Sequence, residues 1–352
     1  MKRQILLVVL LIAQNAIALA GKVPAKLLPP LPEPLTNNAV VTVRSGEGEY
    51  IVSFAGLGKG RGPADTLAVS YVYDARLPHW SEARAVPGGV GRLASVAASV
   101  GRLAYVFGGY TVAEDGTEVS TPWVHSFDPV SGVFRELRPM PVPVDDAVAV
   151  TYDDRYIYLI SGWHDLGNVN LVQRYDTQTD SWGQATPTPG RGVFGHSGGI
   201  VGSTIIYCDG VAIRPHTDRR RDFVANNECF QGEIDSSDSR RIDWRRLPRH
   251  PGAPRYRMAA AGIERLGSVL FVGGSDNPYN YNGVGYNGEP SQPVADILCY
   301  DLERHMWKTL SADAPASMDH RALAAFGDAW ITVGGMLSDQ RVTDRVVAYS
   351  FE

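Results

Sequence analysis

Side chains able to transfer protons lie beside several predicted strands. Asp319, His320 and Arg321 are consecutive. Such a triplet combines a carboxylate, an imidazole that titrates near neutral pH and a guanidinium that binds anions. His196 and Asp146 occupy similar positions elsewhere in the chain. The sequence therefore predicts His320, His196 and Asp146 as candidate catalytic groups for acid–base chemistry.

A second set of side chains is suited to holding a sugar, because guanidinium groups bond carboxylates bidentately and aromatic rings stack on sugar rings. These candidate ligand-binding residues are Arg92, Trp163, His164, Arg257, Asp276, Tyr281 and Arg321. Each arginine is equally compatible with a structural role, in which it bonds carbonyl groups of a neighbouring repeat. His196 and His320 precede runs of small residues, so internally hydrogen-bonded imidazoles are favoured there over catalytic ones.

Short β-rich runs position these side chains, and the fullest set spans Arg255 to Leu310. Its four runs are Met258–Ile263, Ser268–Val272, Ile297–Tyr300 and Met306–Leu310, the second ending in Gly273-Gly274. Their lengths and apolar content predict four antiparallel strands in one sheet. Such a sheet cannot bury both faces alone. The residues predicted to pack between neighbouring sheets are Trp80, Trp182, Trp244 and Trp307.

The same unit recurs along the chain. Its second run ends in glycine at Gly56, Gly108-Gly109, Gly162, Gly210, Gly273-Gly274 and Gly334-Gly335. The last copy lacks its fourth strand, and the N-terminal segment Leu27 to Leu31 is predicted to supply it. The predicted fold class is therefore all-β. Residues 21–352 are expected to form a single domain, a six-bladed β-propeller closed by an N-terminal strand that completes the last blade.

The repeated Gly-Gly, Tyr-Asp and Trp at a spacing of roughly fifty residues resembles the kelch repeat. Within kelch propellers, the chain is similar to the bacterial sialic acid mutarotase (N-acetylneuraminate epimerase) family. The shared motifs are Gly56-Leu57-Gly58, Arg321-Ala322 before Gly334-Gly335, and Val342-Thr343-Asp344. This resemblance implies the propeller fold and an isomerase or mutarotase acting on an acidic sugar.

One position departs from that family. A glutamate that is the family's proton-transferring base follows the glycine at the end of the second strand of blade four. The corresponding residue here is Val211, which follows Asp209-Gly210. A valine side chain cannot exchange a proton. The resemblance therefore implies the architecture and a class of ligand, but not the family's chemistry.

Loops at one end of the propeller are expected to carry the site. The insertion from Ser275 to Pro293 interleaves asparagine and tyrosine, a mixture suited to polyols or to a polar protein surface. Loops of this length are usually functional or mobile, and this one is expected to cover the loop-bearing face. A second insertion, Arg214 to Asn227, contains three consecutive arginines and is interpreted as a solvated loop.

Composition restricts the partners. The 352 residues carry a formal net charge of −5, with 44% apolar and 20% charged residues and no basic stripe, which argues against nucleic acid. Downstream of the N-terminus, no run approaches the length of a membrane-spanning helix, so membrane insertion is not expected. No metal-ligating or phosphate-binding motif is present. We therefore expect no cofactor and no metal.

Residues 1–20 are predicted to be a signal peptide. Lys2 and Arg3 precede an apolar run that ends at Ala18-Leu19-Ala20, so a periplasmic or secreted location is expected. In an oxidising compartment a disulfide between Cys208 and Cys229 is permitted. The favoured interpretation is nevertheless that both are small buried thiols.

Two hypotheses follow for function. In the first, an exported kelch propeller binds a saccharide on its loop face. This saccharide is a small-molecule sugar, for which an acidic sugar is one candidate, or a polysaccharide. The propeller would then act as a cofactor-free sugar isomerase or mutarotase. The alternative is a non-enzymatic module that docks a protein or a polysaccharide. A deep polar pocket favours the first hypothesis, and a shallow aromatic surface favours the second.

Overall fold

The computed structural model describes residues 22–46, 48–77, 79–218 and 221–351. They form an almost entirely β structure with three short 3₁₀ helices, η1 (Pro63–Asp65), η2 (Glu264–Leu266) and η3 (Ser338–Gln340). No helix in these ranges combines the length and apolar character that a membrane crossing requires. The predicted signal peptide lies outside the described residues.

Six four-stranded antiparallel sheets form the blades of a β-propeller, as the repeats predicted. Blade one contains β2 (Ala39–Ser45), β3 (Gly48–Leu57), β4 (Thr66–Asp74) and β5 (Trp80–Ala83). Blade two contains β6 (Val96–Val100), β7 (Leu103–Phe107), β10 (Val124–Asp128) and β11 (Val133–Glu136). Blade three contains β12 (Val148–Tyr152), β13 (Tyr156–Ile160), β16 (Val172–Asp176) and β17 (Ser181–Ala185).

Blades four and five repeat this order. Blade four contains β18 (Ser197–Val201), β19 (Thr204–Cys208), β22 (Cys229–Ile234) and β23 (Ile242–Leu247). Blade five contains β24 (Ala259–Ile263), β25 (Ser268–Val272), β26 (Ile297–Asp301) and β27 (Met306–Ser311). The strands of blade five match the four predicted runs to within a residue at each end.

The two ends of the described chain meet in blade six. This sheet contains β28 (Ala324–Phe326), β29 (Ala329–Val333), β30 (Val346–Tyr349) and, at its outer edge, β1 (Ala25–Leu28). β1 pairs antiparallel with β30, and Leu27 lies opposite Val347. The predicted closure by the N-terminal strand is therefore confirmed. It pairs an edge of the last blade that would otherwise be open.

Tryptophans of the outer strands join neighbouring blades, as predicted. Each indole Nε1 donates to a backbone carbonyl just after the outer strand of the preceding blade. The four bonds run from Trp80 to Pro29 (3.0 Å), Trp182 to Arg138 (3.0 Å), Trp244 to Thr186 (3.1 Å) and Trp307 to Pro248 (2.8 Å). The same rings pack in the apolar layers between sheets. Each indole thus combines apolar packing with a satisfied donor.

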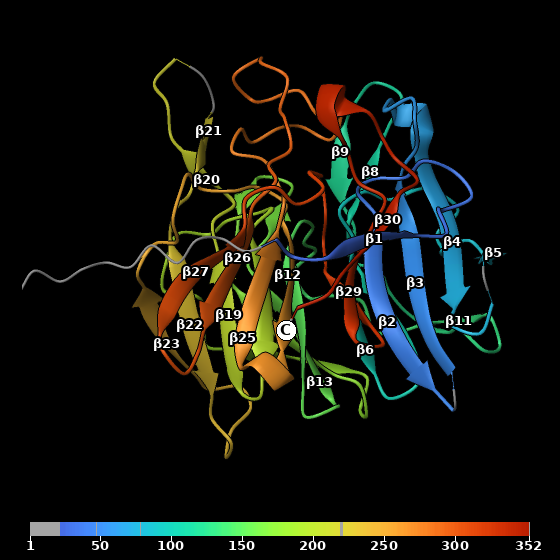
Figure 1. Cartoon of the computed structure of the whole chain (residues 1–352), viewed down its shortest axis with the longest axis horizontal. Coiled ribbons are helices and arrows are strands. Elements are labelled where there is room, and N and C mark those ends of the chain that lie inside the picture. The colour runs from blue at the N-terminus through green and yellow to red at the C-terminus, as the bar shows by residue number, and fades with distance from the viewer. Residues whose placement is uncertain (1–21, 47, 78, 219–220, 352) are drawn as a thin grey trace, which may run out of the picture.

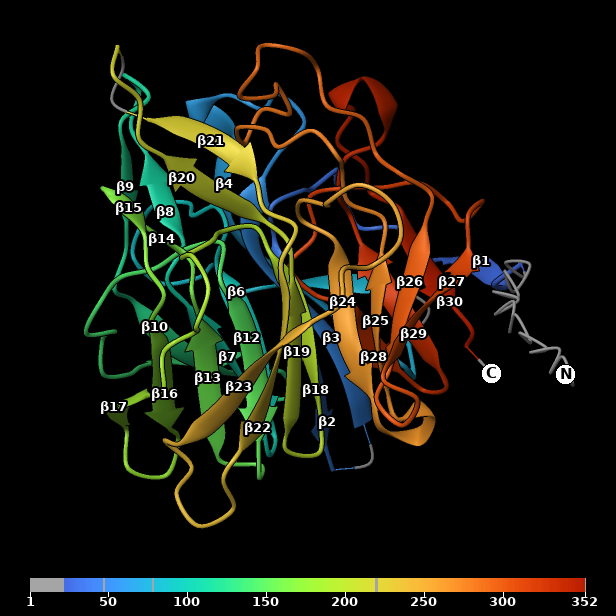
Figure 2. The same cartoon turned by 90° about the vertical axis from the view of Figure 1, so that its left-hand side faces the viewer.

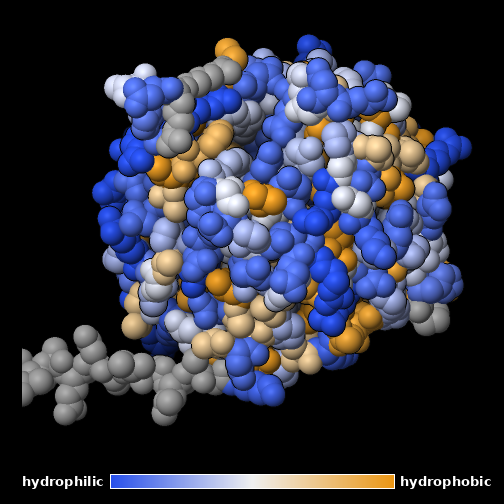
Figure 3. Space-filling model, turned by 90° about the horizontal axis from the view of Figure 1, so that it is seen from above, coloured by the Kyte–Doolittle hydropathy of each residue, from blue (hydrophilic) through white to orange (hydrophobic). Residues whose placement is uncertain are grey.

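The connections from the second to the third strand of each blade gather at one end of the ring, here called the loop face. It carries three hairpins and the 275–293 loop, which rise together at the top of Figures 1 and 2. The hairpins are β8 (Tyr110–Val112) with β9 (Glu118–Ser120), β14 (Trp163–His164) with β15 (Gly167–Asn168), and β20 (Val211–Arg214) with β21 (Asp222–Ala225). Seen from above, the surface is mostly hydrophilic with small apolar patches (Figure 3).

The interpretation of the two cysteines as free thiols is wrong. Cys208 ends β19 and Cys229 begins β22, and the pairing of these strands places the two residues directly opposite each other. They form a disulfide. The sequence predicted adjacent strands, but it did not fix their register, because the β20–β21 hairpin intervenes between them. Cys299 is a buried free thiol.

Candidate functional site

A ring of equivalent residues surrounds the propeller axis on the loop face. In each blade, a residue just before the inner strand forms a β-bridge with a residue near the end of the second strand. The next residue along the chain, between that bridge and the inner strand, adopts a left-handed conformation with φ between 50° and 71°. These six ring residues are Asn37, Ala94, Asp146, Gly195, Arg257 and Asp319.

Backbone hydrogen bonds connect this ring from blade to blade. The amide of Asp146 donates to Ala94 (3.0 Å), that of Gly195 to Asp146 (2.9 Å) and that of Arg257 to Gly195 (2.8 Å). Left-handed backbone is costly for residues other than glycine and persists where the surroundings impose it. The fold therefore holds charged side chains at fixed positions around the axis.

Three of these ring residues, Asp146, Arg257 and Asp319, form one buried charge network with Arg321. Arg257 bonds Asp146 through Nε (3.0 Å) and Nη2, and its Nη1 donates to Asp319 (3.0 Å). The Nε of Arg321 lies 2.8 Å from Asp146, and its Nη2 donates to Asn37 (2.7 Å). No side chain among the four charged residues is more than 3% exposed. Two aspartates thus balance two arginines.

The ion pairs set the ionisation of this network. Burial acts to raise the pKa of Asp319, but Arg257 and Arg321 outweigh it and hold that pKa below its usual range. Thr36 also donates to Asp319 (2.7 Å). Asp319 therefore stays ionised and paired. Two of the three arginines predicted to bind ligand, Arg257 and Arg321, already have carboxylate partners within the protein.

A pocket of about 200 Å³ opens on the loop face beside this network. Blades two to five contribute to it, mainly through the hairpins and the 275–293 loop. The lining residues of this loop-face pocket are Tyr110, Glu118, Asp145, Asp146, Trp163, Phe194, Arg221, Phe223, Arg257, Asn280 and Tyr286. It brings together Asp146, Trp163 and Arg257 from the predicted site.

Aromatic rings form one wall of the loop-face pocket. Trp163 lies 5.4 Å from Phe194 and 5.7 Å from Phe223, measured between ring centroids. Tyr286, from the 275–293 loop, stacks on Phe223 at 4.3 Å. The guanidinium of Arg221 lies over Trp163 at 4.5 Å and donates to the carbonyl of Leu166 (2.8 Å). Such a wall can stack on an apolar ligand face.

Carboxyl groups provide the polar side of the loop-face pocket. Asp145 is 3% exposed, and Ser120 donates to one of its oxygens (2.7 Å). Burial and the adjacent Asp146 raise the pKa of Asp145 well above its usual range. Glu118 keeps contact with solvent, yet the protein surrounding it raises its pKa as well. A carboxyl group with a raised pKa thus lies beside Asp146, which pairs with Arg257 and Arg321.

The two candidate histidines are hydrogen-bonded within the fold. His196 Nε2 lies 3.0 Å from the carbonyl of Ile160, and His320 Nε2 lies 2.9 Å from the hydroxyl of Ser317. Burial lowers the pKa of each imidazole to about 4. Both rings are therefore neutral at neutral pH, and neither lines the loop-face pocket. These contacts agree with the structural interpretation favoured by the sequence.

The remaining predicted residues lie outside this pocket. Arg92 is buried, donates to the carbonyl of Gly108 (3.0 Å) and lies over Trp123. Arg321 lies within the charge network, and His164 is half-buried in β14. Asp276 is exposed, and Tyr281 packs against the apolar cluster under the loops. None of these five residues lines the loop-face pocket.

The 275–293 loop covers part of the loop face, as expected. Asn280 and Tyr286 from this loop line the pocket. Arg61 of blade one donates to the carbonyl of Asn282 (2.6 Å), and Gln340 of blade six donates to that of Ser291 (2.7 Å). The loop is therefore tied to two blades other than its own.

Val211 occupies a fully buried position at the start of β20. It packs in the apolar cluster beneath the loops, and its backbone pairs with Phe194. The Nδ2 of Asn168 donates to its carbonyl (2.7 Å). This position contributes packing and no titratable group.

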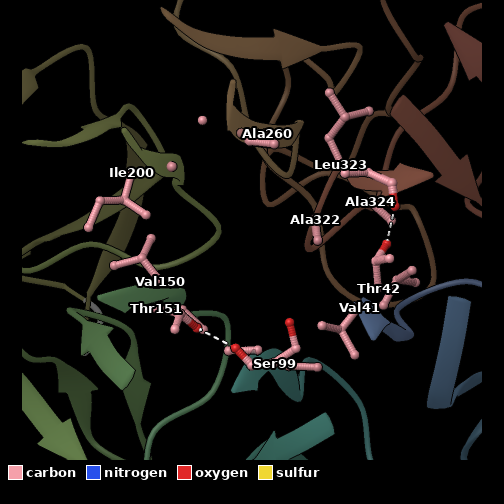
Figure 4. Close-up of a pocket in the computed structure, with 18 of the residues that line it drawn as sticks. Val41, Thr42, Ser99, Val150, Thr151, Ile200, Ala260, Ala322, Leu323 and Ala324 are labelled. Atoms are coloured by element: carbon pink, nitrogen blue, oxygen red, sulfur yellow. Dashed lines mark hydrogen bonds between the residues drawn. The ribbon is translucent and has the colours of Figure 1, made fainter. Parts of the chain in front are cut away.

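A larger cavity of about 490 Å³ lies among the inner strands of the blades. Its walls are mostly small or apolar side chains such as Val41, Ala260 and Ala322 (Figure 4). The hydroxyls of Thr42 and Thr151 already bond carbonyl groups of neighbouring blades. This cavity is larger than the loop-face pocket, and its charged lining residues Arg44 and Asp154 already bond Glu49 and the amide of Gly101.

Sequence reasoning missed Glu118 and Phe223. Both belong to hairpins inserted between the second and third strands, β8–β9 and β20–β21. The available signal was length, because both insertions exceed what a turn requires. Which side chains of a hairpin face a pocket depends on the docking of that hairpin against its neighbours.

Comparison with protein families gives a match to the kelch motif over residues 91–141, which span blade two. The chain is 26% identical over 248 residues to Kelch-like protein terF of Aspergillus terreus, a match covering 68% of this chain and 49% of that protein. It is 24% identical over 257 residues to human Kelch domain-containing protein 3, covering 68% of this chain and 62% of that protein. The match thus spans about half to three fifths of these relatives.

Among solved structures, the one titled "Structure of YjhT" superposes with a TM-score of 0.73 and 16% sequence identity. The superposition covers 93% of this chain and 98% of that one. At this identity the similarity concerns the fold, a six-bladed propeller.

Proposed function

We propose that this protein binds a saccharide in the loop-face pocket. One observation carries the proposal. The lining of the pocket combines an aromatic wall around Trp163 with the carboxyl groups of Glu118 and Asp145. Aromatic rings cover the apolar face of a sugar, and carboxyl groups bond its hydroxyls. A volume of about 200 Å³ suits one sugar unit, either free or within a longer glycan.

The same pocket supports a proposal of sugar isomerisation without a cofactor. Mutarotation needs an acid that gives a proton to the ring oxygen and a base that accepts the proton of the anomeric hydroxyl. Asp145, with its raised pKa, is suited to the first role, and a carboxylate lining the same pocket to the second. Because the Val211 side chain cannot act as a base, the carboxyl groups of the pocket would carry out both proton transfers.

The alternative is a docking module for a protein or a polysaccharide. The exposed part of the 275–293 loop favours it, because Asp276, Asn280 and Glu289 face solvent next to the pocket. The loop is held by Arg61 and Gln340, so a partner would meet an ordered polar surface. A saccharide remains our first proposal, because the pocket is concave and lined by aromatic rings.

The disulfide is consistent with an exported protein. Disulfides persist in oxidising compartments such as the periplasm or the extracellular space, and Cys208 is bonded to Cys229. We therefore retain the proposal of a periplasmic or secreted location with cleavage after residue 20. Mass spectrometry of the native protein tests it, because cleavage predicts a mature chain beginning at Gly21.

Binding is tested by saturation-transfer NMR with neutral, amino and acidic monosaccharides and their oligomers. We expect transfer to at least one sugar, and loss of that signal in Trp163→Ala. Val130→Ala is the matched control, since Val130 is exposed in the turn between β10 and β11, outside the loop-face pocket. Absence of transfer to every sugar would reject the proposal in favour of the docking module.

A further inference from the structure

We propose that the loop-face pocket selects a saccharide carrying an unsubstituted amino group, an ammonium cation at neutral pH, over neutral and acidic sugars. This inference rests on the proposed saccharide function. It differs from the acidic sugar that the sequence suggested as a candidate ligand. Three features of the pocket support it: the commitment of its arginines, an incompletely bonded buried carboxyl, and aromatic faces suited to positive charge.

The guanidinium groups lining the pocket already have partners. Arg257 bonds Asp146 and Asp319. Arg221 lies over Trp163 and donates to Leu166. An acidic sugar would therefore bring its carboxylate towards Glu118, Asp145 and Asp146, and would compete with existing ion pairs for any cation. The described part of the lining therefore holds three carboxyl groups and no guanidinium that lacks a partner, a composition that disfavours an anionic ligand.

Asp145 offers the acceptor for that ligand. The residue is 3% exposed, lines the pocket and accepts one hydrogen bond, from Ser120. Among the described residues no donor reaches its other oxygen. This oxygen is therefore open to a donor from a ligand in the pocket. An ammonium group has three donors and no acceptor, so it can bond this oxygen, and its positive charge favours the ionised form of Asp145.

The aromatic wall is also suited to a cation. The guanidinium carbon of Arg221 lies 4.5 Å from the centroid of Trp163 and 5.5 Å from that of Phe223. Cations bind ring faces because the π system is negative there. The structure thus already seats one positive group against this wall.

Matched sugars test the inference. Glucosamine, N-acetylglucosamine, glucose and glucuronic acid are titrated against the full chain by NMR at neutral pH. We expect glucosamine to bind roughly tenfold more tightly than glucose, because a charge-assisted hydrogen bond replaces a neutral one. N-acetylglucosamine, whose amide is uncharged, should lose that gain. Glucuronic acid should bind most weakly.

Two substitutions assign the preference to the pocket. Asp145→Asn and Glu118→Gln keep side-chain shape and remove a carboxylate, and each should lower the ratio of glucosamine to glucose affinity. Equal or tighter binding of glucose or glucuronic acid by the parent protein overturns the inference and leaves saccharide binding intact. A ratio unchanged in both variants overturns it as well. Failure of all four sugars and their oligomers to bind overturns the proposed function itself.

Discussion

Arg257 of the loop face connects to Asp146 across two blade boundaries, with its Nε 3.0 Å from the Asp146 carboxylate. Nη1 of the same guanidinium donates to Asp319, which leads into blade six (3.0 Å). One side chain therefore joins three parts of the ring that are far apart in sequence. Both ends of each contact are buried. The network fixes the floor beside the loop-face pocket.

Removing this arginine should be costly. Arg257→Met keeps much of the side-chain volume but leaves two aspartates close together and buried, so we expect a loss of about 3–5 kcal/mol in unfolding free energy. Urea unfolding monitored by tryptophan fluorescence measures it. Arg44→Met is the control, because Arg44 pairs with Glu49 at the surface and should change stability by about 0.5 kcal/mol or less. Equal effects of the two substitutions would contradict a central role for the network.

The disulfide should stabilise the protein measurably. Cys208 and Cys229 are 21 residues apart in sequence, and closing a loop of this length contributes about 3 kcal/mol in the chain-entropy model. The double substitution Cys208→Ala with Cys229→Ala should therefore lower the midpoint of urea unfolding and abolish its sensitivity to reductant. Cys299→Ala should leave that sensitivity unchanged. A parent protein unaffected by reductant would contradict the prediction.

Buried histidines should make the fold sensitive to acid. Burial lowers the pKa values of His196 and His320 from 6.5 to about 4. As pH falls below the ordinary histidine pKa, these two imidazoles bind protons in the unfolded chain but stay neutral in the folded protein. The free energy of unfolding should therefore decrease as pH falls from the ordinary histidine pKa of 6.5 towards the lowered pKa of about 4. Above pH 6.5 these histidines should have no effect on stability.

Melting temperatures measured between pH 4 and pH 7 test this expectation. His196→Gln should flatten the dependence, whereas His79→Gln should not, because His79 is exposed. An unchanged slope in the His196 variant would show that this imidazole does not contribute.

Asp145 should have the opposite effect at higher pH. Its raised pKa means that the folded protein keeps the proton where the unfolded chain has lost it. The resulting stabilisation is complete below the ordinary carboxyl pKa, near 4, and is lost as pH rises through the raised value. The Asp145→Asn variant has no carboxyl group to ionise at this position. The melting temperature of the variant minus that of the parent should therefore increase as pH is raised from 4 to 8. A difference independent of pH would mean that Asp145 ionises normally.

The propeller could be predicted from the sequence because its signals are local and repeated. Each blade carries its own glycine after the second strand, and Gly108 shows the reason. Its φ is 52°, and an added Cβ would lie 2.2 Å from the carbonyl of Val144 in the segment leading to the next blade. The closing strand could also be predicted, because the last repeat lacked one.

The site was harder to predict, because blade packing determines which residues meet. Asp146 and Arg321 are far apart in sequence, and nothing local in either segment indicates that they pair. The sequence favoured both arginines of the network as candidate ligand groups without revealing their aspartate partners. Glu118 and Phe223 reach the pocket through hairpins whose orientation is set by tertiary contacts.

The central claim is that a sugar occupies the loop-face pocket. A crystal structure of the protein grown with glucosamine tests it most directly. The account predicts density for a sugar ring against Trp163, with its amino group within hydrogen-bond distance of Asp145. Density confined to the cavity among the inner strands or to the outer surface, with the loop-face pocket empty, would contradict it.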